Sequence, residues 1–392
     1  MNILNMKRYI NQGLFFLSAL ILGCSSNNIS TSMAPVPSVH SRLNQSIVWN
    51  KYPLGRVRFP LSNLRPEYKY DKIFIADYRG LVKALDPVTG NTIWSKDLGT
   101  KKHPAELSGG IVAGLNKVFI GSEDGRVYAL DEKSGDQVWT TRVSGEVLSP
   151  PAVDRALVLV STSRDELIAV DPDSGKKKWV IPAHQIPSLS IRGSSTPLTA
   201  SDSVFWGTAS GYLAMASLSS GKLVSKSPID LPRGVNEIDR IVDVDSSPLI
   251  TGSMLFATAY QGELIAFDLK SGTVKWKHRC SSVLDMISDG VTIFLSTEKD
   301  HIVALDIRSG KERWINNKLE NRLVTAPVLV GGHVVVGDSQ GYLYWIDLDT
   351  GNFVSKQLID SSGFSIAPIA LPGGCLVLTK NGSLKKIAIS SF

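Results

Sequence analysis

The stretch Gly125-Arg-Val-Tyr-Ala-Leu-Asp131, followed by Ser134-Gly135 and then Trp139, decides the fold of this 392-residue chain. Its pattern is a glycine, alternating apolar residues that end in Ala-Leu-Asp, a Ser/Thr-Gly pair and a tryptophan four residues after that second glycine. The pattern recurs eight times, with some copies degraded, at spacings of 45, 40, 46, 51, 38, 41 and 41 residues. The copies begin at Gly80, Gly125, Asp165, Gly211, Gly262, Asp300, Gly341 and Gly382. A period of about 40–50 residues with alternating apolar residues predicts four short strands per repeat, which is typical of a β-propeller blade.

Each part of the repeat predicts one part of a blade. The alternation in Val127–Leu130 has a period of two, so it predicts a strand with side chains on both faces of a sheet. Asp124-Gly125 predicts a tight hairpin before this strand, and Asp131–Gly135 predicts a wider one after it. A Ser/Thr-x-Pro motif precedes the expected innermost strand of several repeats, where proline withholds only one donor. These motifs begin at Ser149, Ser195, Ser246 and Thr325.

The tryptophans predict how the ring closes. Six of the eight occupy the repeat position, where a large ring can wedge between adjacent blades: Trp49, Trp94, Trp139, Trp179, Trp276 and Trp314. Trp49 precedes the first complete repeat, and the last repeat stops at Phe392 without an outer strand. We therefore predict an all-β fold, an eight-bladed β-propeller with quinoprotein-like (PQQ-type) repeats, whose final blade is completed by the N-terminal segment around Ser46–Trp49. This closure removes the free sheet edge that a linear array would leave.

The N-terminus predicts a lipoprotein leader. Lys7-Arg8 and the apolar run Gly13–Leu22 form a signal-peptide pattern that is too short for a membrane span. The run ends in Ile21-Leu22-Gly23-Cys24, which resembles a bacterial lipobox, and Ser25 after the cysteine favours the outer membrane by the same resemblance. We predict a signal peptide over residues 1–23, a flexible tether over 24–45 that begins at the lipidated Cys24, and a propeller over 46–392. The tether is predicted from a composition rich in Ser, Asn and Pro.

Charge and motifs indicate no catalytic, metal or nucleic-acid site. The formal charge of +6 is scattered, without a basic stripe interleaved with aromatic residues. The six histidines are not at ligand spacing, and the Asp243–Ser247 stretch lacks the glycine and the glutamate of a calcium loop. The recurring aspartates, such as Asp86 and Asp131, are interpreted as turn residues. Cys280 and Cys375 lie at non-equivalent repeat positions, so buried thiols are favoured over a disulfide.

The Ala-Leu-Asp…Thr-Gly…Trp repeat also resembles that of the quinoprotein alcohol dehydrogenases, which are eight-bladed enzymes. Those enzymes carry long active-site loops, a calcium site and adjacent cysteines over the cofactor. This chain has no Cys-Cys pair and only 38–51 residues per repeat. We therefore predict neither a cofactor nor an enzymatic activity, and a small quinoprotein dehydrogenase remains the alternative hypothesis.

The repeat is interrupted at two neighbouring places. The two longest spacings, 46 and 51, are consecutive, and their extra residues fall in the connections that precede and follow the fourth blade. Insertions on one face of a repeat protein commonly form its binding face. One insertion carries Leu189, Ile191 and Arg192, and the other carries Asp243 and Asp245. Either these residues form an interface with a partner, or Arg192 pairs with the aspartates while the apolar residues pack beneath their own loop.

These features together resemble the BamB family, lipoproteins of the outer-membrane β-barrel assembly (BAM) machinery. The resemblance rests on the lipobox, the eight repeats and four stretches: Leu189–Gly193, Glu237–Asp245, Val336–Tyr342 and Asp360–Phe364. It implies a non-catalytic scaffold at the periplasmic face of the outer membrane that binds the POTRA domains of BamA. Leu189, Ile191 and Arg192 would be contact residues, with Asp243 and Asp245 beside them. A second alternative is a chaperone-like module that binds unfolded barrel proteins directly by strand addition.

Overall fold

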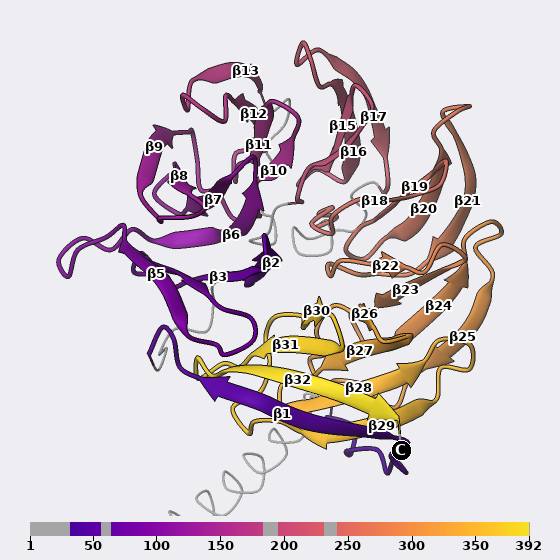
Figure 1. Ribbon diagram of the computed structural model, residues 1–392. Helices are drawn as coiled ribbons and strands as arrows, with labels where there is room; N and C mark the ends of the chain where they lie inside the picture. Colours follow the sequence, from indigo (N-terminus) through magenta and orange to yellow (C-terminus); the bar gives the residue numbers. More distant parts are fainter. Residues whose placement is uncertain (1–31, 56–63, 183–194, 231–240, 392) are drawn as a thin grey trace, which may run out of the picture. The chain divides into compact units, whose positions relative to one another are not determined.

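The computed structural model describes residues 32–55, 64–182, 195–230 and 241–391. Contacts divide the chain into two units, Met1–Ser32 and Met33–Phe392, and nearly all described residues belong to the second. These residues form 32 strands arranged as eight four-stranded antiparallel sheets, the blades of a propeller (Figure 1). Within this described part, no helix is long and apolar enough to cross a membrane. The predicted eight-bladed all-β fold is confirmed.

The blades are numbered here along the chain, and each is given with its strands from the inside of the ring outward. Blades 1 to 4 are β2(Glu67–Lys69), β3(Lys72–Ala76), β4(Leu81–Leu85) and β5(Thr92–Asp97); β6(Leu107–Gly114), β7(Lys117–Ser122), β8(Arg126–Asp131) and β9(Gln137–Arg142); β10(Ala152–Asp154), β11(Leu157–Ser161), β12(Leu167–Val170) and β13(Lys177–Ile181); β14(Leu198–Ala200), β15(Ser203–Gly207), β16(Tyr212–Ser217) and β17(Leu223–Pro228). Blades 5 to 8 are β18(Leu249–Thr251), β19(Met254–Thr258), β20(Glu263–Asp268) and β21(Thr273–Arg279); β22(Ile287–Ser288), β23(Thr292–Ser296), β24(Ile302–Asp306) and β25(Glu312–Asn316); β26(Val328–Val330), β27(His333–Gly337), β28(Tyr342–Asp347) and β29(Phe353–Leu358); β30(Ile369–Leu371), β31(Gly374–Leu378), β32(Leu384–Ser391) and β1(Leu43–Lys51).

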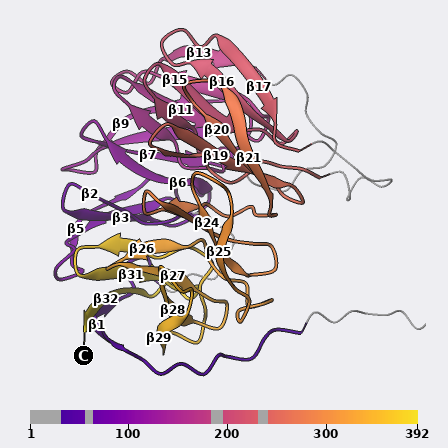
Figure 2. The same ribbon diagram turned by 90° about the vertical axis from the view of Figure 1, so that its right-hand side faces the viewer.

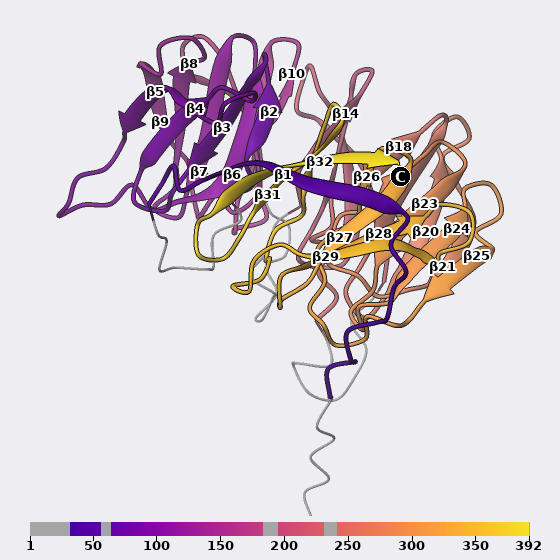
Figure 3. The ribbon, with the colours of Figure 1, turned by 60° about the horizontal axis from the view of Figure 1, so that its bottom comes forward.

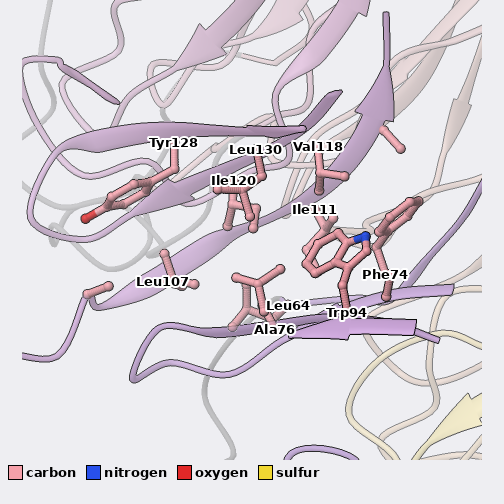
Figure 4. Packing of buried hydrophobic residues seen from close by; sticks show 14 residues of the cluster. Leu64, Phe74, Ala76, Trp94, Leu107, Ile111, Val118, Ile120, Tyr128 and Leu130 are labelled. Carbon is pink, nitrogen blue, oxygen red and sulfur yellow. The ribbon is translucent and has the colours of Figure 1, made fainter. Parts of the chain in front are cut away.

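The hydrophobic core lies between the blades. Each of eight buried clusters is shared by two neighbouring sheets, because both faces of a propeller blade are covered. Figure 4 shows the cluster between blades 1 and 2, where Phe74 and Trp94 of blade 1 face Val118 and Leu130 of blade 2. A change that loosens the packing between two blades therefore disrupts the hydrophobic core itself.

Six seams, the interfaces between neighbouring blades, share one tryptophan contact. The indole N–H of the outer strand donates to a main-chain carbonyl of the next blade at 2.8–3.4 Å. The same ring covers the turn glycine of that blade so closely that a Cβ there would lie 2.4–3.0 Å from it. The pairs are Trp49–Gly90, Trp94–Gly135, Trp139–Gly175, Trp179–Gly221, Trp276–Gly310 and Trp314–Gly351. The repeat therefore pairs its Trp with the Ser/Thr-Gly of the following copy, which confirms the predicted wedge.

The predicted closure by an N-terminal strand is also confirmed. β1 pairs antiparallel with β32 from Leu43–Ser391 to Lys51–Leu384, and the indigo β1 lies beside the yellow β32 in Figure 1. Trp49 thereby reaches blade 1, where its indole donates to the carbonyl of Pro87. The last blade is completed by a strand more than 330 residues away in the sequence.

The end of the predicted tether differs from the expectation. Leu43 to Gln45 belong to β1, and the residues before it are hydrogen-bonded to the propeller. The Ala34 N–H donates to the Glu320 carbonyl at 2.9 Å, for example. Composition gave the wrong end for the tether, because main-chain N–H and C=O groups form hydrogen bonds without the apolar side chains on which the prediction relied. The predicted signal peptide and Cys24 lie outside the described residues.

Candidate partner-binding face

The connections between blades all emerge at the same face of the propeller. Each runs from an outer strand to the inner strand of the next blade, so all of them leave the sheets at the same end. The two lengthened connections join β13 to β14 and β17 to β18 on either side of blade 4. Leu189, Ile191 and Arg192 lie outside the described residues, whereas Asp243 and Asp245 lie in the second connection.

The described end of the β17–β18 connection is wedged between blades 4 and 5. Val244 is 1 % exposed and lies against Gly207 of β15, where a Cβ would come within 2.0 Å of the Val244 carbonyl. The Val244 N–H donates to the Thr208 carbonyl at 3.2 Å, and the Asp243 carbonyl accepts from the Tyr260 N–H at 2.9 Å. The main chain of this segment is therefore fixed to both blades.

The two aspartates differ in how much solvent they reach. Asp243 is 1 % exposed, so its carboxylate lies beneath the surface rather than on it. Asp245 is half-buried, and burial raises its pKa to about 7. A carboxyl with such a pKa changes its charge near neutral pH.

Asp165 is a residue of this face that the sequence analysis did not single out. It replaces the glycine that begins most repeats and adopts a φ of 60° in the β11–β12 turn. Burial raises its pKa to about 6, and its Oδ1 accepts one long bond of 3.4 Å from the Ala209 N–H. Its counterpart Asp300 instead accepts from Leu323 and Val324, residues of the following connection. In the sequence, Asp165 is marked only by standing where most repeats begin with glycine.

The recurring aspartates are turn residues, as predicted. The Asp131 carboxylate accepts from the N–H groups of Lys133 and Ser134 at 2.9 Å, and these bonds lower its pKa. In blade 4, where Ser217 takes that position, the Asp202 carboxylate reaches across from the neighbouring hairpin. No group of three or more His, Cys, Asp or Glu side chains among the described residues could hold a metal ion.

Cys280 and Cys375 are buried thiols, in different blades and not bonded to each other. Burial raises the pKa of both to about 12, so neither forms a thiolate at neutral pH. Both pack within interblade clusters. Their role in the described structure is that of small apolar residues.

The Val336–Tyr342 and Asp360–Phe364 motifs lie away from Asp243 and Asp245, at blades 7 and 8. Asp338 is fully buried and pairs with the equally buried Arg322 at 2.7 Å. Asp360 pairs with Lys385 of β32 at 2.9 Å. Burial alone would raise the pKa of Asp360, but the Lys385 ammonium and the Ser362 hydrogen bonds outweigh it and lower the pKa. These motifs are thus structural elements around the closing blade.

The fold and the repeat define the class of this protein: an eight-bladed propeller with quinoprotein-like repeats and long connections on one face. Residues 78–316 match the family model of outer membrane protein assembly factor BamB. The chain is 49 % identical to that factor of Vibrio cholerae, over 98 % of this chain and 100 % of the relative. It is 38 % identical to the Escherichia coli factor over the same shares. The chain belongs to the BamB family.

Solved structures agree on the fold. The crystal structure of BamB from Moraxella catarrhalis superposes with a TM-score of 0.78 at 22 % identity, covering 88 % of this chain and all of that one. A quinohemoprotein alcohol dehydrogenase from Comamonas testosteroni superposes with a TM-score of 0.71 at 13 % identity, covering 88 % of this chain and 76 % of that chain. Similarities at these identities establish the propeller and nothing about activity.

Proposed function

We propose that this protein is a non-catalytic scaffold lipoprotein that aids the assembly of outer-membrane proteins. Membership of the BamB family over nearly the full length is the observation that carries the proposal. The protein would be held by acyl chains on Cys24 at the periplasmic face of the outer membrane, as part of the BAM complex. Multiple acylation fits this role because one chain anchors a protein only marginally.

The partner in this proposal is the POTRA region of BamA, bound at the face that carries the long connections. Leu189, Ile191 and Arg192 would make the contact, since an arginine flanked by apolar residues is typical of interface hot spots. Asp243 would act indirectly, by supporting Arg192 from below the surface, because its carboxylate is almost fully buried and cannot offer a broad contact surface. Asp245 lies nearer the solvent and would contribute at the edge of the interface.

The hydrogen-bonded position of Val244 supports a main chain that is already ordered at Asp243 and Asp245 before binding. Because the main chain of Asp243 and Val244 is hydrogen-bonded to blades 4 and 5, this described end of the connection loses little conformational entropy on binding. The scaffold role also agrees with the buried, protonated thiols, which offer no reactive sulfur. Direct binding of unfolded barrel proteins would add a partner and has no separate observation in its favour.

The proposal is tested by recovery of BamA with variants of the face. Arg192→Glu, or Leu189→Ala with Ile191→Ala, should abolish copurification of BamA from detergent-solubilised membranes. A hot-spot loss of about 2 kcal/mol corresponds to roughly thirtyfold in affinity. Lys133→Glu makes the same charge reversal at an exposed turn of the opposite face and should retain BamA. Normal melting with full recovery of BamA by Arg192→Glu would refute this placement of the interface.

Asp243 needs a separate test because it is buried. We expect Asp243→Asn to weaken binding through Arg192, so that the double variant is no weaker than Arg192→Ala alone. A double-mutant cycle on the BamA affinity measures this coupling. Strict additivity would show that Asp243 and Arg192 act independently.

A further inference from the structure

The chain before β1 is fastened to blade 7 and does not simply extend from the closing strand. We call residues 33–42 the strap. Its two ends bind through the main chain: Ala34 donates to the Glu320 carbonyl at 2.9 Å, and Arg42 donates to the Val354 carbonyl of β29 at 2.8 Å. Figures 2 and 3 follow this indigo segment along β29 to β1. The strap therefore runs along blade 7, from the β25–β26 connection to β29, before the chain enters β1 of blade 8.

One buried side chain forms the clasp of the strap. Arg322, in the β25–β26 connection, is 1 % exposed and donates from Nη1 to the Ala34 carbonyl at 2.7 Å. Its Nε and Nη2 donate to Asp338 Oδ2 at 2.8 and 2.7 Å, and Nη2 also donates to Gln340 Oε1 at 2.7 Å. A buried guanidinium is tolerated only when its donors are satisfied. The Ala34 carbonyl of the strap is the acceptor for Nη1, in addition to the acceptors that blade 7 provides.

The clasp is held in place by blade 7 itself. Asp338 Oδ2 also accepts from the Tyr344 hydroxyl at 2.9 Å, and its Oδ1 accepts from the Gln340 and Tyr342 N–H groups. Further along the strap, Lys356 of β29 donates to the Pro37 carbonyl at 2.6 Å and lies 5.8 Å from the Tyr342 ring. These side chains come from the Val336–Tyr342 motif and its neighbours, which are not among the proposed BamA contact residues.

We propose that the strap and its clasp orient the propeller on the membrane. The inference rests on the proposed lipidation of Cys24. With Ala34 clasped, ten residues separate the anchor from the propeller and span at most about 35 Å. With the strap detached up to Leu43, nineteen residues would allow about 65 Å. The clasp thus halves the reach of the anchor and fixes the point at which it leaves the propeller.

That point lies on the connection face. Glu320 and Arg322 belong to the β25–β26 connection, which emerges at the same face as the β13–β14 and β17–β18 connections. The anchored terminus therefore pulls this face toward the bilayer. The opposite face, with the β24–β25 turn at Asp306–Lys311, points away from it. A partner anchored in the same membrane then meets the face that carries Asp245.

The clasp is tested by trypsin cleavage of the full mature lipoprotein. Residues 24–41 contain no Lys or Arg, so Arg42 is the first tryptic site. Ala34→Pro removes the N–H that binds Glu320 without touching the buried ion pair, and Arg322→Lys keeps the charge but loses the fork. Both should be cut at Arg42 about tenfold faster than wild type, which corresponds to about 1.4 kcal/mol. Ala34→Ser keeps the main-chain bonds and is the control; cleavage of Ala34→Pro at the wild-type rate would overturn the clasp.

Orientation is tested on vesicles with acceptor-labelled lipids. Lys318→Cys and Lys311→Cys place a donor dye on exposed sites of the connection face and the opposite face of blade 6, and the two native thiols are buried. Energy transfer to the lipids should be greater from Lys318→Cys, and the difference should shrink when Ala34→Pro is added. Equal transfer from both sites would refute the orientation. Failure of every variant to bind vesicles would instead refute the Cys24 anchor, while the trypsin result would still decide the clasp.

Discussion

Two seams of the ring lack the outer-strand tryptophan, and they differ in what takes its place. At the seam between blades 7 and 8, Ser355 takes the tryptophan position opposite Trp345 of β28. Trp345 is fully buried, and Ser355 is 1 % exposed and accepts from Gln45 Nε2 at 2.7 Å. At this seam the indole belongs to the neighbouring strand β28 instead of the outer strand, and Gln45 of the N-terminal segment covers the remaining space.

The seam between blades 4 and 5 is not sealed. Ser225 takes the tryptophan position opposite Met215, and both Ser225 and the turn glycine Gly272 of blade 5 are exposed. A Cβ at Gly272 would meet nothing within 4 Å, whereas the six covered glycines each lie under an indole. Phe267 beneath this site is 9 % exposed, although its counterparts Leu85 and Leu130 are fully buried.

The difference in packing between the two seams follows from where the ring closes. The ring closes through the noncovalent pairing of β1 with β32 in blade 8. The seam beside that blade is stabilised by the Trp345 indole and the Lys385–Asp360 ion pair, and the buried Arg322–Asp338 pair holds the strap to blade 7. Blades 4 and 5, like every pair of neighbouring blades, are joined by a connection, but they do not contain the strand pair that closes the ring, so a weaker seam between them leaves the closure intact. That weaker seam lies beneath the connection that carries Asp243 and Asp245.

Truncations of the N-terminus should give the largest effect. Relative to a chain that starts at Met33, a start at Leu43 removes the strap and should cost about 1–3 kcal/mol, because Arg322 loses one acceptor. A start at Asn50 also removes most of β1 together with Trp49, whose burial alone contributes about 3–5 kcal/mol. Denaturant unfolding measures both. Equal stabilities for all three chains would contradict sealing by the N-terminus.

The same substitution should have opposite signs at the two seams. Ser355→Trp inserts a ring where Trp345 and Gln45 already fill the space, so we expect destabilisation by about 3 kcal/mol. Unfolding in urea gives the value. A neutral Ser355→Trp would mean that this seam also has room for an indole.

Ser225→Trp should stabilise the protein by about 1 kcal/mol. The new ring would cover Gly272 and Phe267 as the other six tryptophans cover their partners, and the gain is reduced by the entropy of fixing the side chain. Thermal melting measures the gain, with Ser225→Ala as the control. A loss of stability would show that the seam is shaped by something other than the missing ring.

Most of the fold could be predicted from the sequence because each blade repeats its own signals. The Asp-Gly turns, the Ser/Thr-x-Pro inner strands and the tryptophan slot each have a local physical cause. The strap could not be predicted, since its bonds come from main-chain groups and from Arg322, which lies 288 residues away from Ala34. Asp243 and Asp245 were both singled out from the second insertion, and their part in partner binding stays a prediction. The burial of Asp243 could not be predicted, because it depends on the packing of Val244 between blades 4 and 5.

The smallest expected effect concerns pH. Because burial raises the pKa of Asp245 to about 7 from an ordinary value near 4, the unfolded chain loses this proton first as pH rises. Stability should therefore fall between about pH 4 and pH 7, by up to about 1 kcal/mol after allowance for partial exposure. Asp245→Asn should remove that part of the decline in melting temperature. An unchanged pH profile would place the Asp245 carboxyl in a wetter site.

Hydrogen exchange of the two outer strands tests the contrast between the seams most directly. Amides of β17, at the seam between blades 4 and 5, should exchange about tenfold faster than those of β29, at the sealed seam. Ser225→Trp should slow exchange in β17 alone, and removal of the strap should speed it in β29 alone. Equal protection of β17 and β29 in the wild-type protein would contradict the account of one sealed and one open seam.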